Sequence, residues 1–142
     1  MNEARTVLVG VDGSEGSVNA VRWALREARL RNDTVEVIHS WHVPYYDVTG
    51  AIPYPGDVMQ DSAKAVISTV MEAVTDDICD VTITSRVDLG QAAPTLIDAS
   101  KNADLLVVGR RGHGGFLSLV MGSVAQQVAA HAHCPVVIVA CE

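Results

Sequence analysis

The sequence predicts an α/β fold in which five parallel strands form one doubly wound, Rossmann-like sheet. Short runs rich in Val, Ile and Leu alternate along the chain with stretches that have the periodicity of amphipathic helices. Such alternation is typical of parallel sheets, whose right-handed crossovers place helices on both faces. With 142 residues, the chain has the length of one domain, which we expect to span residues 1–142.

Five segments have the length and composition of buried strands. They are Thr6 to Val11, Thr34 to Trp41, Val81 to Val87, Asp104 to Val108 and Val136 to Ala140. In the strand order 3-2-1-4-5, the first and fourth strands lie on either side of the topological switch point. Because doubly wound sheets bind their ligands there, we expect a ligand site between the ends of these two strands.

The segments between the strands predict four helices. Pro94 to Ser100 is a short helix, and the last helix is expected to run from Ser123 to about His131. The Ser-x-x-Gln spacing from Ser123 to Gln126 is typical of a capping box. The two longer helices have apolar faces, made by Val18, Val21, Leu25 and Ala28 in one and by Met59, Ala63, Val66, Val70 and Ala73 in the other.

The most informative motif follows the fourth strand. It reads Gly109-Arg110-Arg111-Gly112, then nine residues, then Gly122-Ser123. Glycine lets the backbone approach a phosphate, and the N–H groups of the following helix N-terminus attract an anion. The alternative is that these glycines only form a tight connection between a strand and a helix. Because open glycine backbone stands beside a helix N-terminus, the motif favours a site for an anionic ligand.

A second glycine turn follows the first strand, Gly10-Val11-Asp12-Gly13. Both strands that border the predicted crevice thus end in Gly-x-x-Gly, which leaves open backbone on both of its walls. Asp12 is a candidate site residue, although it could equally cap the first helix. No lysine lies next to the glycine-rich motif, so phosphates would depend on backbone N–H groups, Ser123, the two arginines or His113.

These motifs resemble the universal stress protein family, whose ATP-binding branch carries Gly-x2-Gly-x9-Gly-Ser/Thr. The opening residues Val7 to Ser14 and the strand end Ile38-His39-Ser40 also look like that family, so the resemblance covers nearly the whole chain. The main departures are Arg110-Arg111, where a small residue often comes first, and Ser40, where an aliphatic residue is common.

The resemblance implies an ATP site, with Mg²⁺ bound through the phosphates. It implies that Asp12 lies by the nucleoside end of the ligand and that Ser40 lines the adenine pocket. The candidate nucleotide-binding residues are Gly10, Val11, Asp12, Ser40, Gly109, Arg110, Arg111, Gly112, His113, Gly122, Ser123 and Val124.

We therefore expect an ATP-binding stress-response protein in which nucleotide occupancy sets a regulatory state. No residue is clearly placed to activate a water for rapid phosphoryl transfer, so binding is favoured over catalysis. Two alternatives stay open. One is a slow ATPase or nucleotidyl transferase on the same fold, and the other is a dimeric interaction module that binds no nucleotide, as in the family's other branch.

Composition limits the partners and the compartment. Ten basic and 17 acidic residues give a net charge of −7, which argues against general binding to nucleic acid or anionic membranes. No run approaches the roughly 18 apolar residues of a membrane span. Three cysteines without a Cys-x-x-Cys pair, and no apolar leader, favour the cytoplasm. His131, His133 and Cys134 cluster, but at no recognisable zinc spacing.

Two further segments carry predictions. Residues 43–57 hold three of the five prolines and all three tyrosines, and predict a long surface loop or a lid beside the cleft. Val136 to Val139 forms an edge strand without lysine or internal proline, which favours pairing with a second copy. The family resemblance also implies a homodimer through the last strand. The alternative is a monomer in which Cys141, Glu142 and nearby loops cover the edge.

Overall fold

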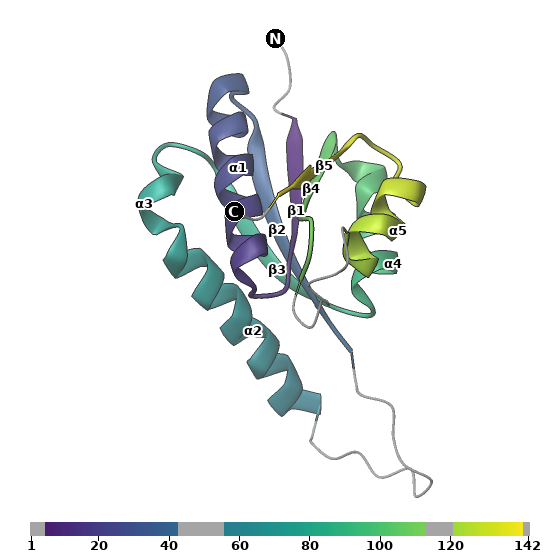
Figure 1. The fold of residues 1–142 in the computed structure, drawn as a ribbon. Helices are drawn as coiled ribbons and strands as arrows, with labels where there is room; N and C mark the ends of the chain where they lie inside the picture. The colour runs from purple at the N-terminus through teal and green to yellow at the C-terminus, as the bar shows by residue number, and fades with distance from the viewer. Residues whose placement is uncertain (1–4, 43–55, 113–120, 141–142) are drawn as a thin grey trace, which may run out of the picture.

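The computed structural model describes residues 5–42, 56–112 and 121–140. It contains one five-stranded parallel sheet with the order β3-β2-β1-β4-β5, which confirms the predicted fold class (Figure 1). The strands are β1 (Thr6–Val11), β2 (Thr34–Trp41), β3 (Ile83–Leu89), β4 (Leu105–Gly109) and β5 (Val136–Val139).

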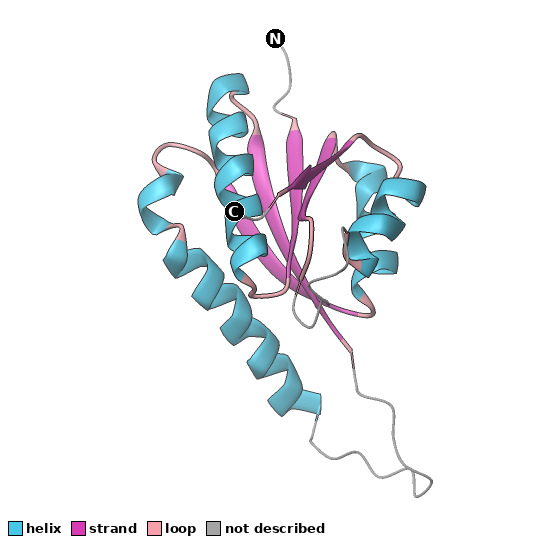
Figure 2. Ribbon diagram, viewed as in Figure 1, coloured by secondary structure: helices cyan, strands magenta, loops and turns pink. Residues whose placement is uncertain are grey.

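Helices cover both faces of the sheet (Figure 2). On one face lie α1 (Glu15–Arg31), α2 (Gly56–Ala73) and the short α3 (Thr75–Ile78), and on the other lie α4 (Ala92–Ala99), the 3₁₀ turn η1 (Ser100–Asn102) and α5 (Ser123–His131). Successive strand residues pack against the helices on opposite faces of the sheet, as period-two geometry requires. Val7 and Val9 pack in the α1 and α2 layer, whereas Leu8 and Leu106 pack in the α4 and α5 layer.

Several predicted elements differ from the observed ones, and three of these differences have a local reason. Strand β3 begins at Ile83 and not at Val81, because the Val81 amide donates to the Ile78 carbonyl in the turn after α3. Helix α4 begins two residues before Pro94. Proline is tolerated in the first turn of a helix because an N–H at that position would have no intrahelical acceptor, so the N–H that proline lacks is not missed. Helix α3 was not predicted, since four residues are too few to show helical periodicity.

Helix α1 has clear signals at both ends. Ser14 is the N-cap, and its Oγ accepts a hydrogen bond from the Ser17 amide at 3.2 Å. At the other end, Asn32 adopts a left-handed conformation with φ 61°, and its amide donates to the Ala28 carbonyl. On the apolar face between them, Val21, Leu25 and Ala28 have 0% exposure, and Val18 is partly buried. Capping and burial therefore fix α1 against the sheet.

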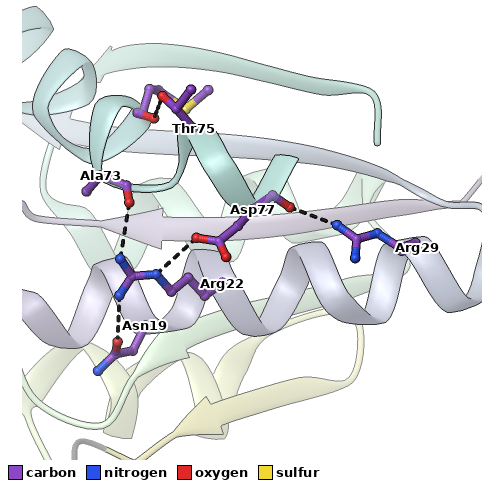
Figure 3. A network of polar contacts seen from close by, with 7 residues as sticks. Asn19, Arg22, Arg29, Ala73, Thr75 and Asp77 are labelled. Atoms are coloured by element: carbon purple, nitrogen blue, oxygen red, sulfur yellow. Dashed lines mark hydrogen bonds and ion pairs between the residues drawn. The ribbon is translucent and has the colours of Figure 1, made fainter. Parts of the chain in front are cut away.

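Two arginines on α1 hold the junction between α2 and α3 (Figure 3). Arg22 Nε donates to Asp77 Oδ2 at 3.2 Å, and its Nη2 donates to the Ala73 carbonyl at 3.1 Å. Arg29 Nη2 donates to the Asp77 carbonyl at 3.0 Å. The last carbonyls of a helix have no intrahelical donor, so these guanidinium groups satisfy acceptors that would otherwise depend on water. They attach the helical connection between β2 and β3 to α1.

We predict that Leu25→Ala lowers the free energy of unfolding by about 2–5 kcal/mol, because it leaves a cavity in a closely packed core. Leu30→Ala on the same helix is the matched control, since Leu30 is 82% exposed, and should change stability by less than about 0.5 kcal/mol. Urea denaturation followed by circular dichroism measures both values. Equal losses in the two variants would contradict the described packing of α1.

Candidate functional site

A cleft of about 310 Å³ lies at the carboxyl ends of β1 and β4. Strand β1 pairs with β2 on one side and β4 on the other, so the cleft occupies the topological switch point. Eleven of the twelve candidate residues line it, namely Gly10, Val11, Asp12, Ser40, Gly109, Arg110, Arg111, Gly112, Gly122, Ser123 and Val124. The twelfth, His113, lies outside the described residues. Residues 43–55 of the loop or lid predicted over 43–57 also lie outside them, and its predicted end was wrong, because α2 begins at Gly56.

The sequence reasoning missed several residues of the cleft wall. They are Ser14, Ser17, Ile38, Ala92, Leu96, Val108 and Ala125. Ser14 directly follows the first glycine turn and Ser17 comes three residues later, so both could have been found by extending that motif. Ile38 could have been found because period-two geometry places it on the same sheet face as Ser40. Ala92 and Leu96 belong to α4, whose apolar sequence gives no sign of a ligand site.

The two glycine turns contact each other at the base of the cleft. A Cβ atom on Gly112 would collide with the carboxylate of Asp12, whose Oδ1 accepts a hydrogen bond from the Ser14 amide at 2.9 Å. Ser14, and not Asp12, is the N-cap of α1, so the alternative that Asp12 caps this helix was wrong. Gly13 has φ 87°, a conformation that favours glycine. Asp12 is thus held between the two turns.

The carboxyl end of β4 lies close to the first turn of α1. A Cβ atom on Gly109 would lie only 3.0 Å from the backbone carbonyl of Gly16. The absence of a side chain on both residues lets α1 approach the glycine-rich turn closely. Ser14 and Ser17 of this helix line the same cleft. The N-terminus of α1 therefore contributes to the cleft wall.

The predicted capping box at α5 was wrong. Gly122 is the N-cap and makes no side-chain cap hydrogen bond, while Ser123 is the first helical residue. Its Oγ accepts a hydrogen bond from Gln127 Nε2 at 2.9 Å, and Gln126 Nε2 donates to the Met121 carbonyl at 3.1 Å. The reason lies in the glycine turn, because the Arg110 carbonyl accepts from the Gly122 amide at 2.7 Å and fixes Gly122 just before the helix.

Within the described residues, this arrangement leaves the N-terminus of α5 at the cleft without a side-chain cap. Ser123, Val124 and Ala125 all line the cleft, and the first amides of an α-helix have no intrahelical acceptor. The positive end of the helix dipole lies at the same place. The geometry favours an anion at this end of the cleft.

Arg110 adds a positive charge to this part of the cleft. The side chain is partly buried, and its Nε is fully buried without a hydrogen-bond partner in the part of the chain that the structure describes. The backbone amide donates to the Val139 carbonyl of β5 at 2.9 Å. Arg111 also lines the cleft. Two guanidinium groups thus follow β4 in a chain whose net charge is −7.

Another part of the cleft wall is apolar. Ile38 and Leu96 are buried with 1% and 3% exposure, and Val108 lies beside them in the same packed layer. A Cβ atom on Gly10 would collide with the Leu96 side chain, so the glycine lets α4 close over this wall. Ser40 supplies a hydroxyl among these apolar groups. The cleft therefore combines an apolar surface with an anion-attracting one.

Other candidate chemistry finds no support in the described ranges. Residues 5–42, 56–112 and 121–140 contain no group of three or more His, Cys, Asp or Glu side chains that could hold a metal ion. Burial raises the pKa of the Cys134 thiol, and the negative charge of Asp104 raises it further, so this thiol stays protonated at neutral pH. Within the same ranges, no helix combines the length and hydropathy that a bilayer span requires.

Known proteins resemble this chain in both sequence and fold. The sequence matches the universal stress protein family over residues 3–140. Universal stress protein Rv2623 of Mycobacterium tuberculosis is 35% identical over 144 residues, which cover 97% of this chain and 48% of the relative. The chain therefore spans about half the length of the curated relatives it matches.

Some solved structures with the same fold contain a nucleotide. A universal stress protein in complex with cAMP is 26% identical, with a TM-score of 0.69 over 97% of this chain and 98% of that chain. The universal stress protein from Archaeoglobus fulgidus in complex with dAMP is 23% identical, with a TM-score of 0.70 over the same shares of the two chains. From the family match and the fold together, the chain belongs to the universal stress protein family.

Proposed function

We propose that the cleft binds an adenine nucleotide, with ATP as the ligand, and that occupancy sets a regulatory state in a stress response. The observation that carries this proposal is the convergence of two glycine turns and an uncapped helix N-terminus on one cleft. Amide N–H groups from a helix N-terminus are well suited to hold phosphate oxygens. Mg²⁺, where present, would be bound through the phosphates.

The two kinds of cleft wall match the two ends of a nucleotide. The phosphates would lie against the Gly109 to Gly112 turn and the N-terminus of α5, where backbone approach is open. The adenine ring would lie against Ile38 and Leu96, with the Ser40 hydroxyl as a hydrogen-bonding group. Asp12 would contact the nucleoside. The roles of Asp12 and Ser40 are those that the family resemblance implies, and both residues line the same cleft as the glycine turn and α5.

The family supports the same class of ligand. The two structures in complex with cAMP and dAMP show that members of this fold family hold adenine nucleotides. Here the family motif Gly-x2-Gly-x9-Gly-Ser is complete at Gly109, Gly112, Gly122 and Ser123. The regulatory role of the whole protein, including any partner, is part of the proposal, because the chain spans about half of its curated relatives.

We also propose a homodimer through β5, which lies at an edge of the sheet. The carbonyls of Pro135 and Val139 accept hydrogen bonds from β4, so by alternation Val137 also faces β4. The backbone groups of Val136 and Ile138 then face the edge of the sheet, where the described residues supply no further strand, and we propose that they pair across a two-fold axis. All four residues of β5 are only partly buried in the single chain.

We predict that Gly122→Glu lowers ATP affinity by more than about a hundredfold, because a carboxylate beside the phosphates adds like-charge repulsion of several kcal/mol. Isothermal titration calorimetry measures the affinity, and circular dichroism checks folding. Gly122→Ala should fold normally, since the nearest atoms to its Cβ would lie 3.4 Å away.

The neutral Gly122→Gln variant is the control for side-chain size in this experiment, because it differs from glutamate only in charge. It should lose less affinity than Gly122→Glu. A folded Gly122→Glu protein that binds ATP as tightly as the wild type would remove the glycine turn and α5 from the nucleotide site.

We predict that the wild-type protein sediments as a dimer at micromolar concentration and that Ile138→Pro shifts it to the monomer. Proline removes an amide that faces the open edge, whereas the ladder to β4 uses residues of the other parity. Sedimentation equilibrium decides the mass, and circular dichroism checks that the variant is folded. A monomer mass for the wild type, with and without ATP, would rule out the dimer. A folded variant that stays dimeric would place the interface elsewhere.

A further inference from the structure

Arg110 has an unusual environment for an arginine next to a solvent-accessible cleft. Its Nε is fully buried, and no hydrogen-bond acceptor for it exists within the described parts of the chain. A buried donor that lacks an acceptor is unfavourable, and more so when the group carries a charge. Arg110 as a residue is only partly buried and lines the cleft, so a ligand there can reach the exposed part of this arginine.

The backbone of Arg110 is fixed from both sides. Its amide donates to the Val139 carbonyl at 2.9 Å, and its carbonyl accepts from the Gly122 amide at 2.7 Å. The side chain therefore begins at a fixed point, directly beside the N-cap of α5. Because little conformational freedom remains to be lost at this backbone, the guanidinium is well prepared to bind an anion.

The chemistry of the guanidinium indicates the kind of anion. The two terminal nitrogens of the guanidinium form a planar fork that can donate two parallel hydrogen bonds to a phosphate. The amides of α5 and the glycine turn already offer donors for one phosphate group. An additional charged fork at the same end of the cleft is suited to a second or third phosphate of one ligand.

We infer that Arg110 makes the cleft selective for ligands with two or three linked phosphates over ligands with one. This inference rests on the proposed function and specifies its ligand as a nucleoside di- or triphosphate. Arg110 is then a specificity residue, and its effect is confined to the phosphates beyond the first.

Calorimetric titrations with ATP, AMP and inorganic tripolyphosphate test this inference on the wild type, Arg110→Ala and Arg110→Lys. The loss of a charge-assisted hydrogen bond should lower the ATP affinity of Arg110→Ala by about tenfold to a hundredfold, with AMP affinity changed by less than about twofold. Tripolyphosphate binding should weaken in parallel with ATP binding. Arg110→Lys keeps the charge but not the fork, so it should regain only part of the loss.

Arg26→Ala is the matched control, because it makes the same change in net charge at an exposed position of α1. Arg26 lies nine residues, or about two and a half helical turns, beyond Ser17 at the cleft. This variant should bind all three ligands as the wild type does. An equal loss of ATP affinity in Arg26→Ala would show that general electrostatics, and not Arg110, gives the preference.

The outcomes separate the two proposals. Equal losses of ATP and AMP affinity in Arg110→Ala, or no loss of either, would overturn the inference and leave nucleotide binding intact. If tripolyphosphate binds in an Arg110-dependent way but ATP and AMP do not bind, the proposal of an adenine nucleotide site is wrong and the inference about linked phosphates stands. No binding of any of the three ligands to the wild type would overturn both. If Arg110→Ala fails to fold, the Arg110→Lys variant decides the question. An Arg110→Lys protein that binds ATP and tripolyphosphate as tightly as the wild type would contradict the role of the guanidinium fork.

Discussion

The contact between the two glycine turns is the constraint on which the rest of the site depends. Parallel pairing of β1 with β4 brings the carboxyl ends of both strands to the same end of the sheet. There, the Asp12 carboxylate occupies the space that a side chain on Gly112 would need, and Gly109 lies against the backbone of Gly16. The turns can meet only because glycine stands at these positions. Residues of both turns line the cleft, together with the N-terminal residues of α1 and α5.

The second turn also connects the cleft to the edge of the sheet. Arg110 is hydrogen-bonded to Val139 of β5 through its amide and to Gly122 of α5 through its carbonyl. A ligand at the N-terminus of α5 would therefore lie next to Arg110, whose backbone is hydrogen-bonded to the last strand, β5. In the proposed dimer, the same strand would pair across the two-fold axis, so nucleotide occupancy and subunit pairing would act on one short stretch of backbone.

Sequence reasoning predicted the fold well because long-range order follows from alternating patterns. The strand order and the position of the cleft came from the periodicity and from two Gly-x-x-Gly turns that end neighbouring strands. It failed where a tertiary contact decides the local structure. The capping box at Ser123 was wrong because the Arg110 carbonyl fixes Gly122 as the N-cap. Leu96 could not be assigned to the cleft, since its role depends on how α4 closes against Gly10.

The central claim is that a nucleotide binds between the glycine turns and α5, and amide chemical shifts test it most directly. In ¹⁵N-labelled protein titrated with ATP, the amides of Gly109 to Gly112 and of Ser123 to Ala125 should shift most. Amides at the opposite end of the sheet, such as Asn32 to Thr34, should stay unchanged. Shifts confined to that opposite end, or no shifts at millimolar ATP, would contradict the account.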